Sequence, residues 1–386
     1  MLSGNLYAED SAGFAPFNLP YYVVAADFNH DGAMDLALAT TTVSTGPHTG
    51  FAAVILQNPQ APGTFFPAVH YRTGADSVWI AAGDLNDDTF ADLVVANNTA
   101  ASISILMQDS THPGTFLAAL NVHVGGFPTS VAIGDLNGDG RLDIAVATGK
   151  RSITVLFQDP AGPAGTFLPP QDFALKGFSY AVAIGDLDND GLADLVVTGN
   201  QVAVLRQNAN EPGAFLPEVD YKAGPQPDSV KIADINGDGK PDLAVSNLGT
   251  PSGPLTASVS VLLQNPSSPG SFLPAASYTA GARASDVTVS DLNHDGRADL
   301  VVANNGLLGN TGSVSVLLQK LSGKSDKLAF TRQNYVGRTE PISATIADLN
   351  GDGLPDIAVA DGRTATVLFQ KPGSPGKFRA PIAVGR

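Results

Sequence analysis

The sequence predicts an all-β protein made of seven similar units, and three observations support this. Each unit carries four short segments rich in Val, Ile, Thr and Phe, separated by Gly, Pro, Asn and Asp. No segment shows a helical period. A phrase of the form D-x-[N/D]-x-D-x-x-x-D recurs in steps of 57, 51, 51, 48, 57 and 57 residues, starting at Asp27, Asp84, Asp135, Asp186, Asp234, Asp291 and Asp348. A period near 50 residues indicates a repeat architecture.

The third repeat shows how the four strands are expected to follow one another. The first runs into the acidic phrase over residues 131–135, and the second leaves it over 143–148. The third covers 152–158, and the fourth follows a Pro/Gly turn over about 165–173. Four antiparallel strands in each of seven repeats are typical of a seven-bladed β-propeller. We predict one such domain over residues 14–386, preceded by a polar tail over residues 1–13.

A phenylalanine of the predicted fourth strand recurs once more than seven blades require. The eight copies are Phe14, Phe65, Phe116, Phe167, Phe215, Phe272, Phe330 and Phe378. The extra copy predicts that the N-terminal and C-terminal segments meet in one blade and close the ring. Which of them takes the outer edge stays open.

The acidic phrases have the chemistry of calcium loops between the first and second strands. Calcium binds six to eight oxygens, and side chains at positions 1, 3, 5 and 9 with the carbonyl of position 7 can supply them. Position 12 is apolar, so these are not EF-hands, which end in a bidentate Glu. The predicted ligands are Asp27, Asn29, Asp31 and Asp35; Asp84, Asn86, Asp88 and Asp92; Asp135, Asn137, Asp139 and Asp143; Asp186, Asp188, Asp190 and Asp194; Asp234, Asn236, Asp238 and Asp242; Asp291, Asn293, Asp295 and Asp299; and Asp348, Asn350, Asp352 and Asp356.

The second loop departs from the pattern at position 6. Glycine permits a sharp turn there because it takes a positive φ cheaply, whereas this loop has Thr89. We expect the second of up to seven calcium sites to be weak or empty. Two alternatives stay open for all the loops: they form Asx-rich turns without metal, or the ions only brace the fold.

Composition narrows the classes of partner. The net charge is −16, but 22 of the 37 acidic residues are ligand candidates, and seven divalent ions would leave about −2. A protein without a basic face does not suit nucleic acid, and no apolar run is long enough to span a bilayer. The chain contains no cysteine. We expect a monomer that is extracellular, periplasmic or on the cell surface, with its signal peptide removed.

The loops divide between the two faces of the predicted ring. The calcium loops and the third-to-fourth turns share one face, and the remaining connections share the other. Three insertions on this second face account for the 57-residue steps, at 40–52, 247–258 and 304–313. They predict a protein or glycan ligand on the face opposite the calcium loops, although tolerated surface loops are the alternative.

A glutamine ends the third strand of every repeat. The seven residues are Gln57, Gln108, Gln158, Gln207, Gln264, Gln319 and Gln370. Each either fixes the turn that follows it or supports the calcium loop from behind.

With seven tandem phrases of this kind, the sequence resembles the FG-GAP/VCBS calcium-binding β-propeller family, which includes the head of integrin alpha chains and certain lectins. The resemblance covers about residues 14–386 and implies calcium ligands at positions 1, 3, 5 and 9 of each loop. The family's Phe-Gly and Gly-Ala-Pro phrases are replaced here by Gly165-Thr-Phe167 and its counterparts. The functions it implies are adhesion, sugar binding and polysaccharide cleavage.

We predict a non-catalytic binding or adhesion module, because a rigid scaffold carries variable loops. A calcium-dependent lectin is the alternative, with Trp79 and Tyr22 as a stacking site, since both lie five residues before a loop's first Asp. Packing between blades 1 and 2 would also explain this pair. A polysaccharide lyase or hydrolase is less well supported, because the six histidines form no evident constellation. Lys231 stands where the other repeats have small or apolar residues, which suggests a salt link near the channel.

Overall fold

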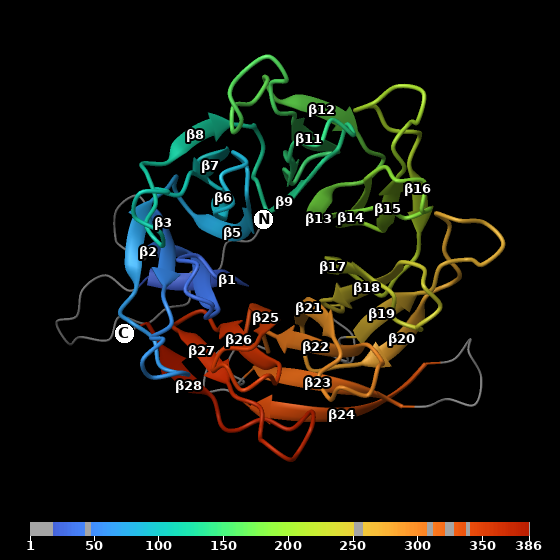
Figure 1. Cartoon of the computed structure of the whole chain (residues 1–386). Helices are drawn as coiled ribbons and strands as arrows, with labels where there is room; N and C mark the ends of the chain where they lie inside the picture. The colour runs from blue at the N-terminus through green and yellow to red at the C-terminus, as the bar shows by residue number, and fades with distance from the viewer. Residues whose placement is uncertain are drawn as a thin grey trace.

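The computed structural model describes residues 18–42, 48–250, 258–306, 312–320, 328–336 and 340–385. These residues form seven four-stranded antiparallel sheets arranged around a central axis (Figure 1). The prediction of an all-β, seven-bladed propeller is confirmed. The described ranges contain no helix that could cross a membrane. The proposed tail over residues 1–13 lies outside them, as does Phe14.

Each blade is built from four consecutive strands, running from the axis outward. The innermost strands are β1 (Asn18–Ala26), β5 (Ser77–Gly83), β9 (Ser130–Gly134), β13 (Ser179–Gly185), β17 (Pro227–Ala233), β21 (Ala284–Ser290) and β25 (Ser343–Ala347). The second strands are β2 (Asp35–Thr42), β6 (Asp92–Asn97), β10 (Asp143–Ala147), β14 (Asp194–Gly199), β18 (Asp242–Asn247), β22 (Asp299–Asn304) and β26 (Asp356–Ala360). The third strands are β3 (Gly50–Ile55), β7 (Ser102–Leu106), β11 (Ser152–Leu156), β15 (Val202–Leu205), β19 (Ser258–Leu262), β23 (Ser313–Lys320) and β27 (Ala365–Leu368). The outermost strands are β4 (Val69–Arg72), β8 (Leu120–His123), β12 (Gln171–Ala174), β16 (Val219–Tyr221), β20 (Ala276–Thr279), β24 (Ala329–Val336) and β28 (Ile382–Val384).

The hydrophobic core is distributed over the seven seams between neighbouring blades. Every residue of the second strands, such as β6, is buried, because these strands are covered on both faces. Each of the seven buried clusters takes its residues from two adjacent blades. A single blade therefore cannot bury its own apolar surface, which is the usual reason that such repeats are stable only as a closed set.

The recurring phenylalanine lies before the outermost strand and packs in the seam between neighbouring blades. In six blades it forms an isolated bridge with the glutamine that ends the third strand, such as Gln158 with Phe167. In blade 6 the corresponding pair, Gln319 and Phe330, lies inside the longer β23–β24 ladder. In five seams the ring packs edge-on against an aromatic ring of the preceding blade, as Phe116 does against Tyr71 at 5.4 Å. The outermost strand begins later than predicted, at Gln171 in blade 3.

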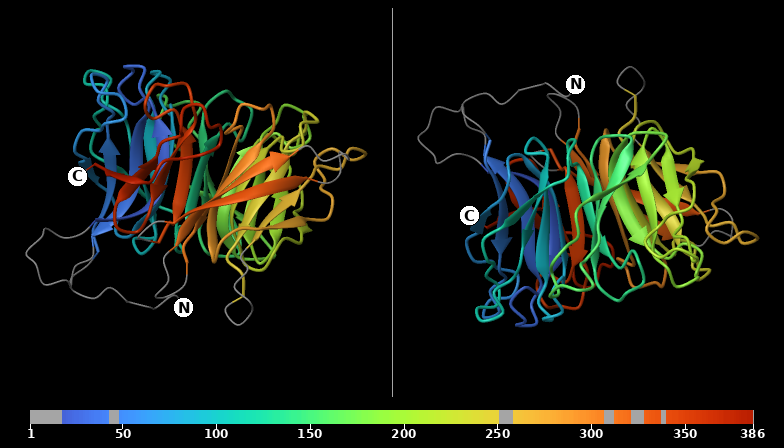
Figure 2. Two further views of the ribbon diagram at one scale, coloured as in Figure 1. Left: turned by 90° about the horizontal axis from the view of Figure 1, so that it is seen from below. Right: turned by 90° about the horizontal axis from the view of Figure 1, so that it is seen from above.

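The ring closes by packing between complete blades. The C-terminal strand β28 is the outermost strand of blade 7, and β25–β28 follow one another in the chain. The described part of blade 7 therefore comes from the C-terminal segment alone, and the N-terminal segment around Phe14, which the prediction also placed at the closing blade, lies outside the described residues. Blades 1 and 7 share one buried cluster, and the backbone N–H of Val23 donates to Ser343 Oγ at 3.0 Å. Edge-on views show the connections gathered on two faces (Figure 2).

The three insertions fall partly outside the described residues, which omit 43–47, 251–257 and 307–311. Their flanking residues lie on the face opposite the acidic loops, because they join second strands to third strands. The assignment of loops to the two faces is thus confirmed by strand order.

The closing seam should depend on Ser343, which is fully buried. Ser343→Ala leaves the Val23 N–H without its partner, so we expect a loss of about 1–3 kcal/mol of folding free energy, measured by denaturant unfolding. Ser130→Ala is the matched control, because Ser130 Oγ accepts from Val182 N–H at 3.3 Å in an interior seam. If Ser343→Ala kept the folding free energy of the parent protein while Ser130→Ala lowered it, the hydrogen bond at the closing seam would not contribute to stability.

Candidate metal-binding loops

The third loop shows how the acidic side chains are held together. Asp135 accepts backbone N–H bonds from Gly138 at 2.7 Å and Gly140 at 2.8 Å. Asn137 Oδ1 accepts from Asp139 N–H at 2.9 Å, and Asp139 Oδ1 accepts from Arg141 N–H at 2.8 Å. Bonds from a residue to backbone groups two to five positions ahead draw the loop into a tight coil. The oxygens of positions 1, 3 and 5 therefore line its inside, where a cation would collect them.

The ninth-position aspartate closes each loop from below. Its side chain is buried at the start of the second strand, with at most 1 % of the residue exposed in all seven loops. In blade 3, Asp143 accepts from Leu136 N–H at 2.9 Å and from Gln158 N–H at 2.8 Å. The same two bonds recur in the other six blades. This carboxylate joins the loop to the second and third strands.

The glutamine at the end of the third strand both fixes the turn that follows it and supports the acidic loop, as the two interpretations of the sequence proposed. Gln158 Nε2 donates to the loop carbonyl of Leu142 at 2.8 Å, and its Oε1 accepts from Gly165 N–H in the next turn at 3.0 Å. Nε2 also reaches the preceding blade, where it donates to Leu85 O at 2.9 Å. Gln264 and Gln319 make the same link to their preceding blades. One side chain thus connects two neighbouring acidic loops.

Burial raises the pKa of every ninth-position aspartate, and the carboxylates at positions 1 and 5 raise most of them further. The pKa of Asp35 and Asp356 rises to about 7. The pKa values of Asp92, Asp143, Asp194, Asp242 and Asp299 rise to about 6. Backbone hydrogen bonds act in the opposite direction but do not offset desolvation. A buried carboxylate beside other carboxylates is an environment that a divalent cation would relieve.

Two positions in each loop take a left-handed backbone conformation. Position 4 does so with His30, Asp87, Asn189 or His294 in four loops and with glycine in the rest. Position 6 is glycine in six loops, and a Cβ built on these six glycines would meet nothing within 4 Å. Glycine is therefore favoured at position 6 by the positive φ of the backbone and not by a lack of space. Thr89 adopts φ 75 and keeps the bond to Asp84 at 2.7 Å, so the second loop has the common shape with a strained residue.

The fourth loop provides the test of whether these residues suit a metal ion. Carboxylate oxygens of Asp186, Asp188 and Asp194 lie within 4.8 Å of one another. Oδ1 of Asp188 is buried and has no hydrogen-bond partner. Converging carboxylates with an unpartnered buried oxygen fit a hard divalent cation such as calcium, which prefers oxygen ligands.

Sequence reasoning missed the counter-charge of this loop. Position 3 is Asp188 here and asparagine in the other six, and Arg206 donates to Asp188 Oδ2 at 3.0 Å. The other repeats place Leu, Met or Phe where Arg206 stands. The sequence signal for this ion pair was that Asp188 and Arg206 both differ from the residues at the same positions of the other repeats. It keeps the charge of the fourth loop equal to that of its neighbours.

Tyr22 and Trp79 lie together, as the sequence suggested, and stack directly on each other. Their ring centroids are 3.7 Å apart, and both belong to the cluster between blades 1 and 2. The packing alternative describes this contact, because each ring covers one face of the other and Tyr22 is only 5 % exposed. A ligand-binding role for the pair stays a prediction.

The side chain of Lys231 forms a hydrogen bond across the centre of the ring. Its Nζ lies 3.0 Å from the hydroxyl of Tyr22, so the bond crosses the centre of the ring from blade 5 to blade 1. The expected salt link is thus a lysine–tyrosine bond. Burial raises the pKa of Tyr22 to about 12, and the charge of Asp286 adds to the shift. The neutral phenol therefore persists at neutral pH.

The fold and loops define a β-propeller with one acidic loop in each blade. Profiles described as FG-GAP-like repeat match residues 84–146, 135–197 and 186–245, and a profile described as FG-GAP repeat matches 284–317. The chain belongs to the FG-GAP repeat family. This confirms the resemblance drawn from the sequence.

Comparisons with solved structures agree on the fold. A structure of BBS1N in complex with ARL6DN, soaked with mercury, superposes with a TM-score of 0.57 at 14% identity, covering 95% of this chain and 96% of that one. The lead-soaked structure of the same complex gives 0.56 with the same coverage. A putative 6-phosphogluconolactonase from Bacteroides uniformis gives 0.57 at 14% identity, with 82% and 85% covered. No curated protein sequence matches the chain.

Thr89→Gly should stabilise the protein, because it removes the cost of holding a β-branched residue at φ 75. We expect a gain of about 1 kcal/mol, read as a higher Tm in calorimetry. The matched control is Gly140→Thr, which places the same residue at the same position of the third loop and should lower stability by a similar amount. A neutral result in both variants would show that the turn is not strained.

The raised pKa values predict an unusual pH dependence for the metal-free protein. Each lies above the value of about 3.9 for an exposed aspartate, so the folded state binds more protons than the unfolded chain. This stabilising contribution is fully present below about pH 4 and is lost as the pH rises through 6 to 7. We expect a lower Tm at pH 7.5 than at pH 5.5 in chelator, and the reverse order in calcium. Equal Tm values in chelator would contradict the argument.

Proposed function

We propose that this chain is a calcium-stabilised, non-catalytic binding module. The observation that carries the proposal is the acidic loop of blade 4, where three carboxylates converge and one buried oxygen lacks a partner. The other six loops repeat its hydrogen-bond pattern around a buried aspartate. Seven such sites would neutralise most of the net charge of −16.

Calcium acts here as a brace for the loops and not as a reagent. Each loop joins the two innermost strands of its blade, and its closing aspartate reaches the third strand. A bound ion would remove the repulsion among the carboxylates and tie these strands together. A rigid ring results, and its opposite face is free to hold a ligand. This arrangement suits binding or adhesion outside the cytoplasm, where calcium is abundant.

Family membership and fold support a binding role. A propeller of the same fold, BBS1N, is found in complex with ARL6DN. By analogy, we propose that a protein or glycan binds the face opposite the acidic loops of this chain. A lectin is the second candidate, favoured by exposed aromatic rings on that same face.

The proposal predicts strong coupling between calcium and stability. Titration of metal-free protein followed by calorimetry should show calcium binding and a rise in Tm that excess chelator reverses. An unchanged melting curve in calcium and in chelator would refute the metal assignment.

Two substitutions should separate the sites. Asp139→Ala removes the fifth-position ligand of the third loop and should lower the metal content by one ion per chain. Asp88→Ala removes the same ligand from the loop that contains Thr89 and should lower it by less than one. Elemental analysis after gel filtration in calcium gives the counts, and circular dichroism checks the fold. Equal losses would show that the second site binds as well as the third.

A further inference from the structure

The third-position side chain of the fourth loop is held differently from those of the other six loops. In those six, the asparagine Oδ1 accepts the backbone N–H of the fifth-position aspartate at 2.9 to 3.1 Å. In the fourth loop, Asp190 N–H donates to Asp186 Oδ1 at 3.1 Å and makes no bond to Asp188 among the hydrogen bonds of the described residues. Arg206 Nη1 donates to Asp188 Oδ2 at 3.0 Å instead. Position 3 of this loop is therefore fixed from outside the loop and not by the loop backbone.

The surroundings of Arg206 keep its side chain beside the loop. It directly precedes Gln207, whose N–H donates to the ninth-position Asp194 at 2.8 Å. A Cβ on Gly270, in the third-to-fourth turn of blade 5, would come within 2.8 Å of Arg206 Cδ and 3.0 Å of Asp188 Cβ. The ion pair therefore lies beneath the turn of the next blade, where glycine leaves room for it.

The bond to Arg206 leaves one oxygen of Asp188 free. This oxygen, Oδ1, is buried and has no hydrogen-bond partner. Among the described residues, only the fourth loop brings oxygens of three carboxylates within 4.8 Å of one another, those of Asp186, Asp188 and Asp194. Turning the Asp188 carboxylate away from this group would break its bond to Arg206. A ligand that is already in place loses less entropy when an ion binds.

The fourth loop also has the highest charge on its candidate ligands. It carries aspartate at positions 1, 3, 5 and 9, whereas the other loops have asparagine at position 3. The affinity of a calcium site depends on the charge and the rigidity of its ligands. The Arg206 side chain is 42 % exposed, so water and salt screen its repulsion of a cation. An oxygen in direct contact with the ion outweighs a more distant arginine, because electrostatic energy falls with distance.

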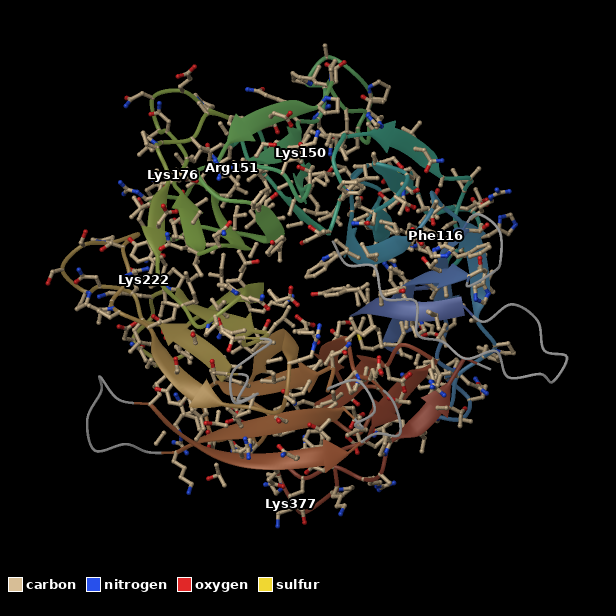
Figure 3. The ribbon with its side chains drawn as sticks, turned by 180° about the vertical axis from the view of Figure 1, so that it is seen from behind. Phe116, Lys150, Arg151, Lys176, Lys222 and Lys377 are labelled. Carbon is tan, nitrogen blue, oxygen red and sulfur yellow. The ribbon has the colours of Figure 1, made fainter. Side chains whose placement is uncertain are left out.

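The neighbouring lysines do not serve this loop. Lys176 and Lys222 follow the outermost strands of blades 3 and 4, and Figure 3 shows them near the periphery of the ring. By strand order they belong to the face opposite the acidic loops. Lys176 lies 3.7 Å from Glu218 and 3.5 Å from Asp220. Arg206 is therefore the cation whose removal tests how Asp188 is held.

We propose that Arg206 is a positioning residue that makes the fourth loop the tightest metal site of the seven. It acts through Asp188, because it binds Oδ2 and so keeps Oδ1 turned toward the ion. At limiting calcium, the protein would hold a single ion, in blade 4. The inference rests on the proposed function, because it ranks the sites within the calcium-stabilised ring.

The test is a calorimetric titration of the metal-free protein with calcium chloride. We expect one ion per chain to bind about tenfold or more tightly than the rest, and Arg206→Leu to abolish this first phase by weakening the site about tenfold or more. Arg206→Lys keeps the charge and one donor, so it should restore part of the affinity. Asp188→Asn combined with Arg206→Leu recreates the pattern of the other loops and should bind like them. Lys176→Leu is the matched control, because it removes an ion-paired cation on the opposite face and should leave the first phase unchanged.

A transplant tests the same idea without changing blade 4. In the first loop, a Cβ on Gly114 would lie 3.1 Å from both Asn29 Cβ and Leu56 Cδ1, so these two residues lie under a turn as Asp188 and Arg206 do. Asn29→Asp combined with Leu56→Arg should therefore create a second tightly bound ion. Circular dichroism checks that each variant is folded.

Three results would overturn the inference: equal affinity at all sites, a first phase that survives Arg206→Leu, and a folded transplant that gains no tight ion. Tighter binding by Arg206→Leu would also overturn it, because the arginine would then only offset charge. All four leave the proposed function standing, since calcium still binds. An absence of calcium binding in every variant would refute the proposed function and this inference with it.

Discussion

The buried carboxylate of the ninth-position aspartate is the contact on which each blade depends. It accepts one backbone N–H from the acidic loop and another from the glutamine that ends the third strand, so three strands meet at one side chain. Burying a charge is costly unless it is paired. The raised pKa of these groups reflects that cost. A cation shared with positions 1, 3 and 5 would offset this cost, so the metal binding that we propose would be coupled to the integrity of the blade.

Neighbouring blades are connected through the same region. The third-to-fourth turn of one blade packs on the loop of the blade before it, where a Cβ on Gly114 or Gly165 would come within 3.1 or 3.3 Å of Asn29 or Asn86. The glutamine of blade 3 bonds to Leu85 in the loop of blade 2. Ordering one loop therefore orders part of the next, because close-packed contacts transmit displacement.

Periodicity made the fold predictable, since the acidic phrase and the strand pattern recur with a common period. The convergence of the acidic side chains in each loop was equally predictable, because the spacing of positions 1, 3, 5 and 9 is that of a tight coil. Contacts across the ring could not be predicted, because Lys231 and Tyr22 are 209 residues apart and no local pattern connects them. Arg206 was detectable only by comparing repeats. The role of the extra phenylalanine motif at ring closure stays a prediction, because Phe14 lies outside the described residues.

Every blade of the described structure is a continuous stretch of chain, from β1–β4 through β25–β28. A propeller whose first and last strands share a blade has a fixed repeat number, because adding a unit separates the two halves of that blade. Here the boundaries of the repeat and of the blade coincide. Duplication of one unit of about 50 residues would insert a complete blade with its own acidic loop, and deletion would remove one. The architecture thus permits evolution by whole blades, with each surface loop free to diverge independently of the others.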